Sequence, residues 1–368
     1  MKLKSKPFDT TLFITILMLA GLGIIMVLSA SSHLGKISYG PPYFFFKRQI
    51  IWVAGGIFVM LILSRISYKI YKKLGIFIFI AAIICLILVL VPGVGRGEIR
   101  GAKRWIDLGF MDFQPSEFAK LAVIIFLSSS LSVNHKRLAK FWSGLVPYFC
   151  MIAIVLALLY KEPHYSAMVL IVIISFILIF VAGAKIWHFI LCAVPLGIGA
   201  AALIIMEPYR LQRIFGYLHP FDDVTGDGWQ IVQSLYAIGT GGIFGLGLGQ
   251  SRQKYLYLPD AHNDFILSIW AEEMGLIGMI LIVALFIVFI WRGLKIATKA
   301  PDLFSSILAT GLTMLVAIQV IFNIGIITNC LPVTGMPVPF LSYGGTSMLL
   351  FMGASGILLN ISRDIEKL

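Results

Sequence analysis

The sequence predicts an all-α integral membrane protein with ten transmembrane helices and with both termini in the cytoplasm. Of its 368 residues, 59% are hydrophobic and only 12% are charged, whereas soluble proteins are about 45–50% apolar and about 25% charged. The apolar residues form continuous stretches of a length that suits a bilayer, without the alternation of a membrane β-strand. Because a backbone in lipid must satisfy its own hydrogen bonds, such stretches indicate helices.

Ten apolar stretches cover most of the chain. They span residues 11–28, 49–64, 74–91, 118–132, 144–160, 167–183, 186–206, 265–290, 303–327 and 345–359. The first stretch is longer than the apolar core of a signal peptide, which spans about 7–15 residues. We therefore expect this stretch to be retained as the first membrane helix.

Positive charge is concentrated on the side of the membrane where the N-terminus lies. The connections predicted for that side carry 16 of the 29 Lys and Arg residues and only four acidic residues. Cytoplasmic loops of membrane proteins collect Lys and Arg. Both termini are therefore predicted to be cytoplasmic, and the net charge of +12 indicates membrane topology rather than nucleic-acid binding.

No repeat, low-complexity segment or change of composition divides the chain, so we expect one membrane domain over residues 1–368. Two outer connections are long, residues 92–117 and 207–264, and a third, residues 329–344, is rich in proline and glycine. The sequence contains no Walker-type phosphate loop and no dinucleotide fingerprint, and its four cysteines have no disulfide or metal-binding spacing. Function is therefore expected in the outer connections.

The densest group of polar residues leads into the eighth apolar stretch and includes His262 and Asp264. Ionisable residues in membrane helices are rare and are usually functional, which makes Asp264 the leading catalytic candidate. The alternative is that Asp264 caps the helix. Glu272 and Glu273 lie deeper in the same stretch. Glu272 could line one wall with Asp264, whereas Glu273 faces the opposite side of the helix, and both acids could instead pair with Lys, Arg or polar residues of other helices.

The first long connection contains Lys103, Arg104 and Trp105. The two cations could bind a lipid phosphate while the indole lies against a sugar or a prenyl chain, although Trp105 could also be an interfacial anchor. Glu117 and Lys120 are spaced to form an i,i+3 ion pair. Ser116 is expected to cap the fourth helix.

Further polar candidates lie in the remaining outer connections and in the ninth stretch. Arg210 and Arg213 suit phosphate oxygens, or they could face solvent. Six glycines in residues 239–249 indicate close backbone packing. Gln319 and Asn323 are expected to form hydrogen bonds with other helices. Residues 332–347, with three prolines and three glycines, predict a non-helical pocket wall that includes Ser342 and Tyr343.

Six motifs of the sequence resemble motifs of one protein family. These motifs are Gly-Ala-Lys-Arg-Trp (101–105), Gln-Pro-Ser-Glu-Phe-Ala-Lys (114–120), Gln-Ser-Leu-Tyr-Ala-Ile-Gly (233–239), Leu-Pro-Asp-Ala-His-Asn-Asp-Phe (258–265), Glu-Glu-Met-Gly (272–275) and Pro-Phe-Leu-Ser-Tyr-Gly-Gly-Thr-Ser (339–347). The sequence resembles the SEDS proteins of bacterial cell-wall synthesis, the group of FtsW, RodA and SpoVE, over essentially its whole length. Residues 248–255 look more like the division and sporulation branch, whereas residues 332–335 look like RodA.

The resemblance implies a multi-pass protein of the bacterial cytoplasmic membrane that polymerises lipid II into glycan strands at the outer face. It implies a class B penicillin-binding protein as partner, and it places the essential acid of the His-Thr-Asp motif at Asp264. The substrate-binding residues predicted on this basis are Lys103, Arg104, Trp105, Glu117, Lys120, Arg210, Arg213, His262, Ser342 and Tyr343. One departure is His164, which stands where the family's Pro-Asp-Leu-Gly-Thr motif has its acid.

We expect Asp264 to take the proton of the attacking sugar hydroxyl in a single inverting displacement, with a pKa raised by burial. The sequence indicates no cofactor, although a divalent cation could share with the basic residues the task of offsetting pyrophosphate charge. Two other functions fit the sequence. A flippase for lipid-linked sugars would use buried acids to gate a path, and a scaffold that only recruits the transpeptidase would not need Asp264.

Overall fold

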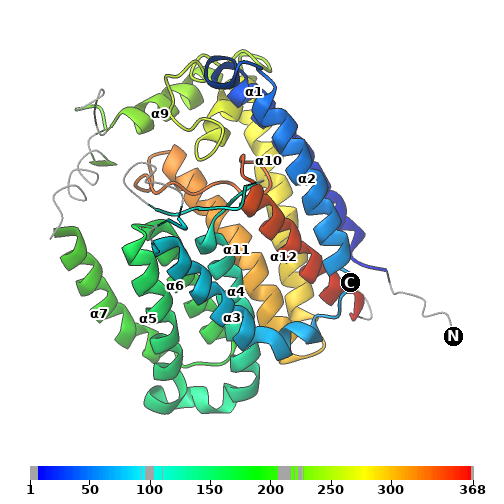
Figure 1. Ribbon diagram of the computed structural model, residues 1–368, viewed down its shortest axis with the longest axis vertical. Coiled ribbons are helices and arrows are strands. Elements are labelled where there is room, and N and C mark those ends of the chain that lie inside the picture. The colour runs from blue at the N-terminus through cyan, green and yellow to red at the C-terminus, as the bar shows by residue number, and fades with distance from the viewer. Residues whose placement is uncertain are drawn as a thin grey trace.

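The computed structural model describes residues 7–91, 93–95, 103–109, 111–205, 217–218, 220–222, 226 and 228–365. All ten predicted apolar stretches are helical in it (Figure 1). These helices are α1 (Thr10–Tyr39), α2 (Phe44–Leu63), α3 (Lys69–Leu90), α4 (Pro115–Asn134), α5 (Val146–Lys161), α6 (Tyr165–Val181), α7 (Ile186–Ile205), α10 (Ile266–Thr298), α11 (Leu303–Ile327) and α12 (Gly345–Arg363). The protein is therefore an all-α membrane protein, as predicted.

Eight helices among the described residues are long and apolar enough to cross a membrane. Helix α6 is apolar but has only 17 residues, so the number of ten crossings stays a prediction. Helices α4, α11 and α12 are the most buried of the eight, whereas α2 and α3 expose apolar side chains such as Phe58 and Phe77. Apolar side chains on the outer surface of the bundle are what a surrounding lipid bilayer requires.

In the described parts of the outer connections, helix α9 (Trp229–Gly241) and the strand pair β1 (Ile106–Asp107) and β2 (Asp112–Phe113) are regular elements that the sequence did not predict. Helix α9 buries Ile231, Val232 and Ala237 and packs against α10 and α11. In the first long connection, β1 and β2 form a short antiparallel pair. Helix α9 was not recognised because its 13 residues are too few for a membrane helix and because glycines follow it.

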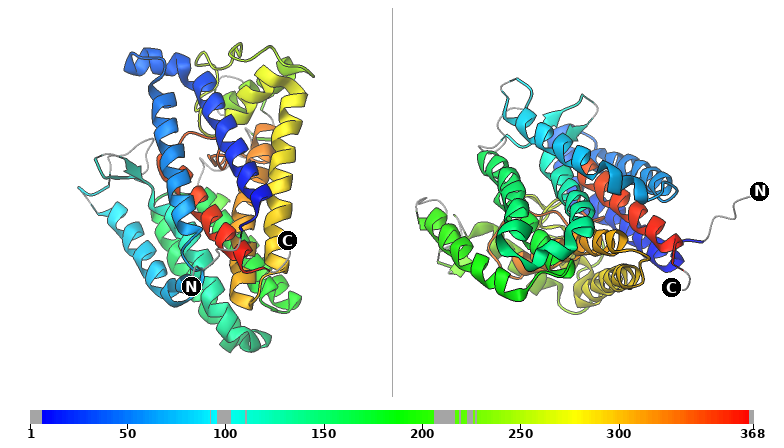
Figure 2. Two further views of the ribbon diagram at one scale, coloured as in Figure 1. Left: turned by 90° about the vertical axis from the view of Figure 1, so that its right-hand side faces the viewer. Right: turned by 90° about the horizontal axis from the view of Figure 1, so that it is seen from below.

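The start of α1 and the end of α12 lie on the same face of the bundle (Figure 2). The backbone N–H of Asp9 donates to Ser362 Oγ over 3.0 Å, and Arg292 forms a 2.6 Å ion pair with Asp9. On the same face, the Tyr68 hydroxyl donates to Asp302 Oδ2 over 2.9 Å. Asp9 thus joins the start of α1 to α10 and α12, and Tyr68 joins the α2–α3 connection to the α10–α11 connection, which agrees with the predicted topology. That this face is cytoplasmic stays a prediction.

Helix α10 is interrupted at Gly275, where φ is 62° and ψ is −162°. The glycine-rich segment after α9 lies against this break, and the N–H of Gly247 donates to the Glu273 carbonyl oxygen over 2.9 Å. A Cβ atom on Gly245 would lie 2.1 Å from that oxygen. The predicted close backbone packing of the glycines is confirmed, but the continuous helix predicted over residues 265–290 is wrong at Gly275.

Candidate active site

Asp264 lies at the end of an outer loop, two residues before α10 begins at Ile266, and it is partly buried. The N-cap position of α10 is Phe265, and no side chain accepts a hydrogen bond there. The structure therefore does not support the interpretation of Asp264 as a helix cap. Its carboxylate is placed by the surrounding loops instead.

Two outer loops meet at Asp264, and Asn323 of α11 joins them. The Asn323 amide donates to the Asp264 carbonyl oxygen over 2.6 Å and to the Met336 carbonyl oxygen over 2.8 Å. The Ser342 hydroxyl makes a second connection by donating to the Asn263 carbonyl oxygen over 2.6 Å. The predicted interhelical hydrogen bonds are wrong for Asn323, because its partners are loop carbonyls, and the buried side-chain oxygen of Gln319 has no hydrogen-bond partner within the described residues.

The Asp264 carboxylate lies against the backbone of Gly335. The φ angle of Gly335 is +67°, and a Cβ atom built there would lie 3.2 Å from Asp264 Oδ2. Residues 332–344 contain no helix, as their prolines and glycines predicted. A glycine at this point permits both the left-handed backbone and the close approach of the carboxylate.

His262, two residues before Asp264, is packed among aromatic rings. Its ring centroid lies 4.7 Å from that of Phe45 and 5.8 Å from that of Tyr343, and Tyr343 N–H donates to the His262 carbonyl oxygen. Burial lowers the pKa of His262 to about 4, against the opposing charge of Asp260. Burial also raises the pKa of Tyr343, while Arg48 beside it has the opposite effect. His262 is therefore neutral at physiological pH.

Arg104 connects the first long outer loop to the turn between α5 and α6. Its guanidinium donates to the carbonyl oxygens of Glu162 over 3.2 Å and of Pro163 over 2.5 Å. Further along the same turn, the Ser166 hydroxyl donates to the carbonyl oxygen of Thr334, next to Gly335. A series of contacts thus connects Arg104 to residues 332–344, the loop whose Gly335 lies against the Asp264 carboxylate.

Glu162 is a buried acid that sequence reasoning missed. Its side chain is fully buried, and neither carboxylate oxygen has a hydrogen-bond partner among the described residues. Burial raises the pKa of Glu162 to about 8, although the charge of Arg104 lowers it. Burial, with the charges of Arg104 and Lys120, also lowers the pKa of His164 to about 3. The signal was an acid directly after an apolar stretch, a position that is usually functional.

The predicted ion pair at the start of α4 is confirmed. Lys120 Nζ lies 2.6 Å from Glu117 Oε1, and both side chains are buried. The prediction that Ser116 caps this helix is wrong, because Gln114 holds the N-cap position with Pro115 directly after it. The Ser116 hydroxyl is instead buried, and within the described part of the chain it has no hydrogen-bond partner.

Not all predicted site residues can be placed next to Asp264. Lys103 and Trp105 are partly buried in the segment that precedes β1 and carries Arg104. Arg210 and Arg213 lie outside the described residues. The binding roles proposed for these four residues, and for Arg104, Glu117, Lys120, His262, Ser342 and Tyr343, stay predictions.

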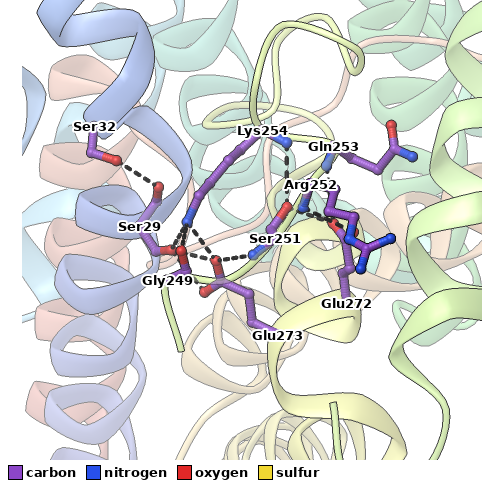
Figure 3. A network of polar contacts seen from close by, with 9 residues as sticks. All are labelled: Ser29, Ser32, Gly249, Ser251, Arg252, Gln253, Lys254, Glu272 and Glu273. Atoms are coloured by element: carbon purple, nitrogen blue, oxygen red, sulfur yellow. Dashed lines mark hydrogen bonds and ion pairs between the residues drawn. The ribbon is translucent and has the colours of Figure 1, made fainter. Parts of the chain in front are cut away.

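Glu273 forms a buried ion pair that links α10 to α1 (Figure 3). Lys254 Nζ lies 2.9 Å from Glu273 Oε1, and the Ser29 hydroxyl donates to both carboxylate oxygens over 2.6 and 2.7 Å. This arrangement confirms the predicted pairing of Glu273 with polar residues, and its partners are a loop lysine and α1.

Glu272 faces the opposite side of the same loop (Figure 3). Its carboxylate accepts the Ser251 hydroxyl over 2.5 Å and the backbone N–H of Arg252 over 3.0 Å. The idea that Glu272 lines one wall with Asp264 is therefore wrong, because its oxygens are used to fix residues 251–253.

Within the described ranges, no group of three or more His, Cys, Asp or Glu side chains could hold a metal ion. The candidate site combines the partly buried carboxylate of Asp264 with the buried acid Glu162 and the cation Arg104 on connected loops. Such a site can accept a proton from a hydroxyl group and can balance negative charge.

The FtsW, RodA and SpoVE family model, described as "Cell cycle protein", matches residues 10–367. Stage V sporulation protein E of Bacillus subtilis is 42% identical over 360 residues, which cover 98% of each chain. A protein of Trichlorobacter lovleyi named "Probable peptidoglycan glycosyltransferase FtsW" is 39% identical over 369 residues, covering 98% of this chain and 96% of that one.

Solved structures agree with this assignment. A chain from a structure described as "Structural coordination of polymerization and crosslinking by a peptidoglycan synthase complex" superposes with a TM-score of 0.79 at 28% identity, covering 98% of this chain and 99% of that one. The crystal structure of the rod shape determining protein RodA of Thermus thermophilus gives a TM-score of 0.72 at 26% identity, covering 98% of each chain. The chain belongs to the FtsW, RodA and SpoVE family of cell cycle proteins, the SEDS family.

Proposed function

We propose that this protein is an inverting peptidoglycan glycosyltransferase that polymerises lipid II at the outer face of the bacterial cytoplasmic membrane. The observation that carries the proposal is the position of Asp264, whose carboxylate lies against Gly335 where two outer loops meet. The activity named for the FtsW relative and the synthase complex of the structural neighbour support it.

In the proposed reaction, the 4-hydroxyl of the acceptor sugar attacks the anomeric carbon of the donor sugar. A glycosidic bond forms, the bond from that carbon to the pyrophosphate breaks, and undecaprenyl pyrophosphate leaves with the electron pair. Asp264 accepts the hydroxyl proton, a step that typically contributes about 10²–10⁴-fold to a rate. An α-linked donor gives a β-linked product by one inversion, so one base suffices.

Positive charge beside the leaving group is the second requirement of this chemistry. Arg104 is the described cation with the clearest connection to the Asp264 loops, through Glu162, Pro163 and Ser166. A divalent cation that arrives with the pyrophosphate is a further proposal. A chelator would then slow polymerisation, and added magnesium or manganese would restore the rate.

A class B penicillin-binding protein is the proposed partner, because the structural neighbour comes from a complex that couples polymerisation to crosslinking. The flippase alternative used Glu272 and Glu273 as gating charges. Both acids instead have fixed partners, and this pairing leaves the flippase without a supporting observation.

The decisive assay uses the purified protein in nanodiscs with fluorescent lipid II, with and without the partner. Electrophoresis of the products should show a ladder of glycan strands, made by the wild type and not by Asp264→Ala. Lipid transport in proteoliposomes without any polymer would contradict the proposal, as would an undiminished ladder from a folded Asp264→Ala variant.

A further inference from the structure

A cavity of about 630 Å³ lies between α9 and the loop that follows the glycine-rich segment. Its size is within the range of small-molecule sites. The residues that line it are Trp229, Gln233, Tyr236, Arg252, Gln253, Tyr255 and Tyr257. The cavity thus combines four aromatic rings, two amides and one guanidinium.

The aromatic rings of this cavity are not core residues. Tyr236, Tyr255 and Tyr257 each expose about half of their surface, and Trp229 is partly exposed. Only Tyr255 has an aromatic neighbour among the described residues, the ring of His33 at 4.7 Å. Aromatic rings that stand free beside polar groups offer flat faces to a ligand with apolar and polar sides.

The polar groups of the cavity lack protein partners. Gln233 is only 7% exposed and forms no hydrogen bond with any described residue. The side-chain oxygen of Gln253 is buried and is likewise unpaired in the described part of the protein. Buried polar atoms are normally hydrogen-bonded. The buried unpaired oxygen of Gln253, beside the Gln233 amide that lines the same cavity, therefore indicates a ligand that carries hydroxyl or amide groups.

Arg252 contributes the positive charge. Its backbone N–H is bound to Glu272, but its guanidinium is exposed and forms no ion pair within the described residues. Figure 3 shows the side chains of Arg252 and Gln253 directed away from Lys254 and Glu273. A free guanidinium in a cavity suits a carboxylate or a phosphate.

Both walls of the cavity are held in place from inside the bundle. Ser234, next to Gln233, forms hydrogen bonds with Ser268 Oγ at 2.7 Å and with the Ile327 carbonyl oxygen at 2.9 Å. The opposite wall is fixed by Glu272 through residues 251–253. Ser268 lies four residues after Asp264, so the cavity is built on the same end of α10 as the candidate base. A cavity that is already formed loses little conformational entropy when it binds a ligand.

We propose that this cavity binds the amino-sugar units of the glycan, as a disaccharide with its peptide. The rings would stack on the pyranose faces, the amides would pair with acetamido and hydroxyl groups, and Arg252 would bind a carboxylate of the lactyl group or the peptide. The inference rests on the proposed function for the substrate class. An aromatic belt that only anchors the protein in lipid would not place the buried oxygen of Gln253, unpaired among the described residues, in the same cavity.

The test is a calorimetric titration of the full-length protein in nanodiscs with a lipid-free disaccharide peptide released from cell wall by a muramidase. Wild type should bind the probe saturably. Tyr257→Ala and Arg252→Ala should each weaken binding about three- to tenfold. Tyr43→Ala is the matched control, because Tyr43 and Tyr257 are both 54% exposed, and Tyr43 lies in the α1–α2 connection. No binding to wild type, or equal binding to Tyr257→Ala and Tyr43→Ala, would overturn the inference.

The sugars could come from the growing strand or from the lipid II head group, and turnover separates these sources. If the cavity holds the growing strand, Tyr257→Ala should shorten the strands. If it holds lipid II, the same change should raise KM for lipid II. If Tyr257→Ala changes neither the strand length nor the KM for lipid II, the inference is overturned. The titration is repeated with Asp264→Asn, which should bind the probe as wild type does. Undiminished polymerisation by Asp264→Asn with intact probe binding contradicts only the proposed function, and polymerisation by wild type without probe binding contradicts only the cavity.

Discussion

The side-chain amide of Asn323 donates to the carbonyl oxygen of Asp264 over 2.6 Å and to that of Met336 over 2.8 Å. Asn323 is fully buried in α11, one of the most buried helices. Through this one side chain, a rigid helix fixes both loops that surround the candidate base. The position of the Asp264 carboxylate therefore depends on the bundle interior and not only on its own loop.

Replacing Asn323 by alanine should lower both stability and turnover. The change leaves two buried carbonyl oxygens unpaired, at a cost of about 1–3 kcal/mol, and a displaced base can lower kcat about 10²-fold. Gln319→Ala is the matched control, because Gln319 is also buried in α11, one turn earlier, and forms no hydrogen bond with the described residues. Thermal unfolding and polymerisation rates of the two variants provide the check, and equal rates would contradict the positioning role.

Replacing Gly335 by alanine should reduce polymerisation more than it reduces stability. A left-handed alanine costs about 1–2 kcal/mol, and the new Cβ atom would lie 3.2 Å from Asp264 Oδ2. Gly40→Ala also places an alanine at a positive φ, +86°, but its Cβ atom would meet no atom within 4 Å. Similar melting temperatures with a lower rate only for Gly335→Ala are expected. Equal rates would show that the carboxylate tolerates this crowding.

Stability should fall as the pH rises toward 9, because burial raises the pKa of Glu162 to about 8. Between its ordinary value of 4.5 and about 8, the folded protein holds a proton on Glu162 that the unfolded chain has released, so folding loses stability with increasing pH. Glu162→Gln removes this titration and should raise the melting temperature relative to wild type at pH 9 but not at pH 4. A constant difference between the two proteins across this range would contradict the assignment.

The pKa of His262 is lowered instead, so its contribution has the opposite sign. Stability from keeping His262 neutral is present above its ordinary pKa of 6.5 and is lost as the pH falls toward about 4. The variant His262→Phe keeps a ring beside Phe45 and Tyr343. Its stability relative to wild type should therefore be greater at pH 5 than at pH 8. Melting curves at the two values measure this gain, and its absence would mean that His262 is not buried as a neutral ring.

The ion pair between Lys254 and Glu273 should be a structural element rather than part of a transport path. Lys254→Met leaves Glu273 buried without its cation and should destabilise the protein by about 3–5 kcal/mol. The double variant Lys254→Met with Glu273→Met removes both charges and should recover most of that loss. Thermal unfolding of wild type, both single variants and the double variant gives the coupling. Independent, additive effects would contradict the pairing.

Much of the fold could be predicted because lipid leaves few alternatives for an apolar backbone, and all ten apolar stretches are helical. The interruption at Gly275 was not predicted, since its partner is the backbone of Gly245, about thirty positions earlier. Glu162 was missed because its burial arises from the packing of the α5–α6 turn against Arg104. Such long-range contacts leave no periodic pattern in a single sequence.

The central claim is that Asp264 is the base for glycosidic bond formation, and the most direct test is the initial rate of lipid II polymerisation by Asp264→Asn. Asp260→Asn is the control, because it makes the same carboxylate-to-amide change four residues earlier in the same loop. We predict a fall of about 10²–10⁴-fold for Asp264→Asn, with a melting temperature close to that of wild type and a largely retained rate for Asp260→Asn. A wild-type rate from folded Asp264→Asn would contradict the claim.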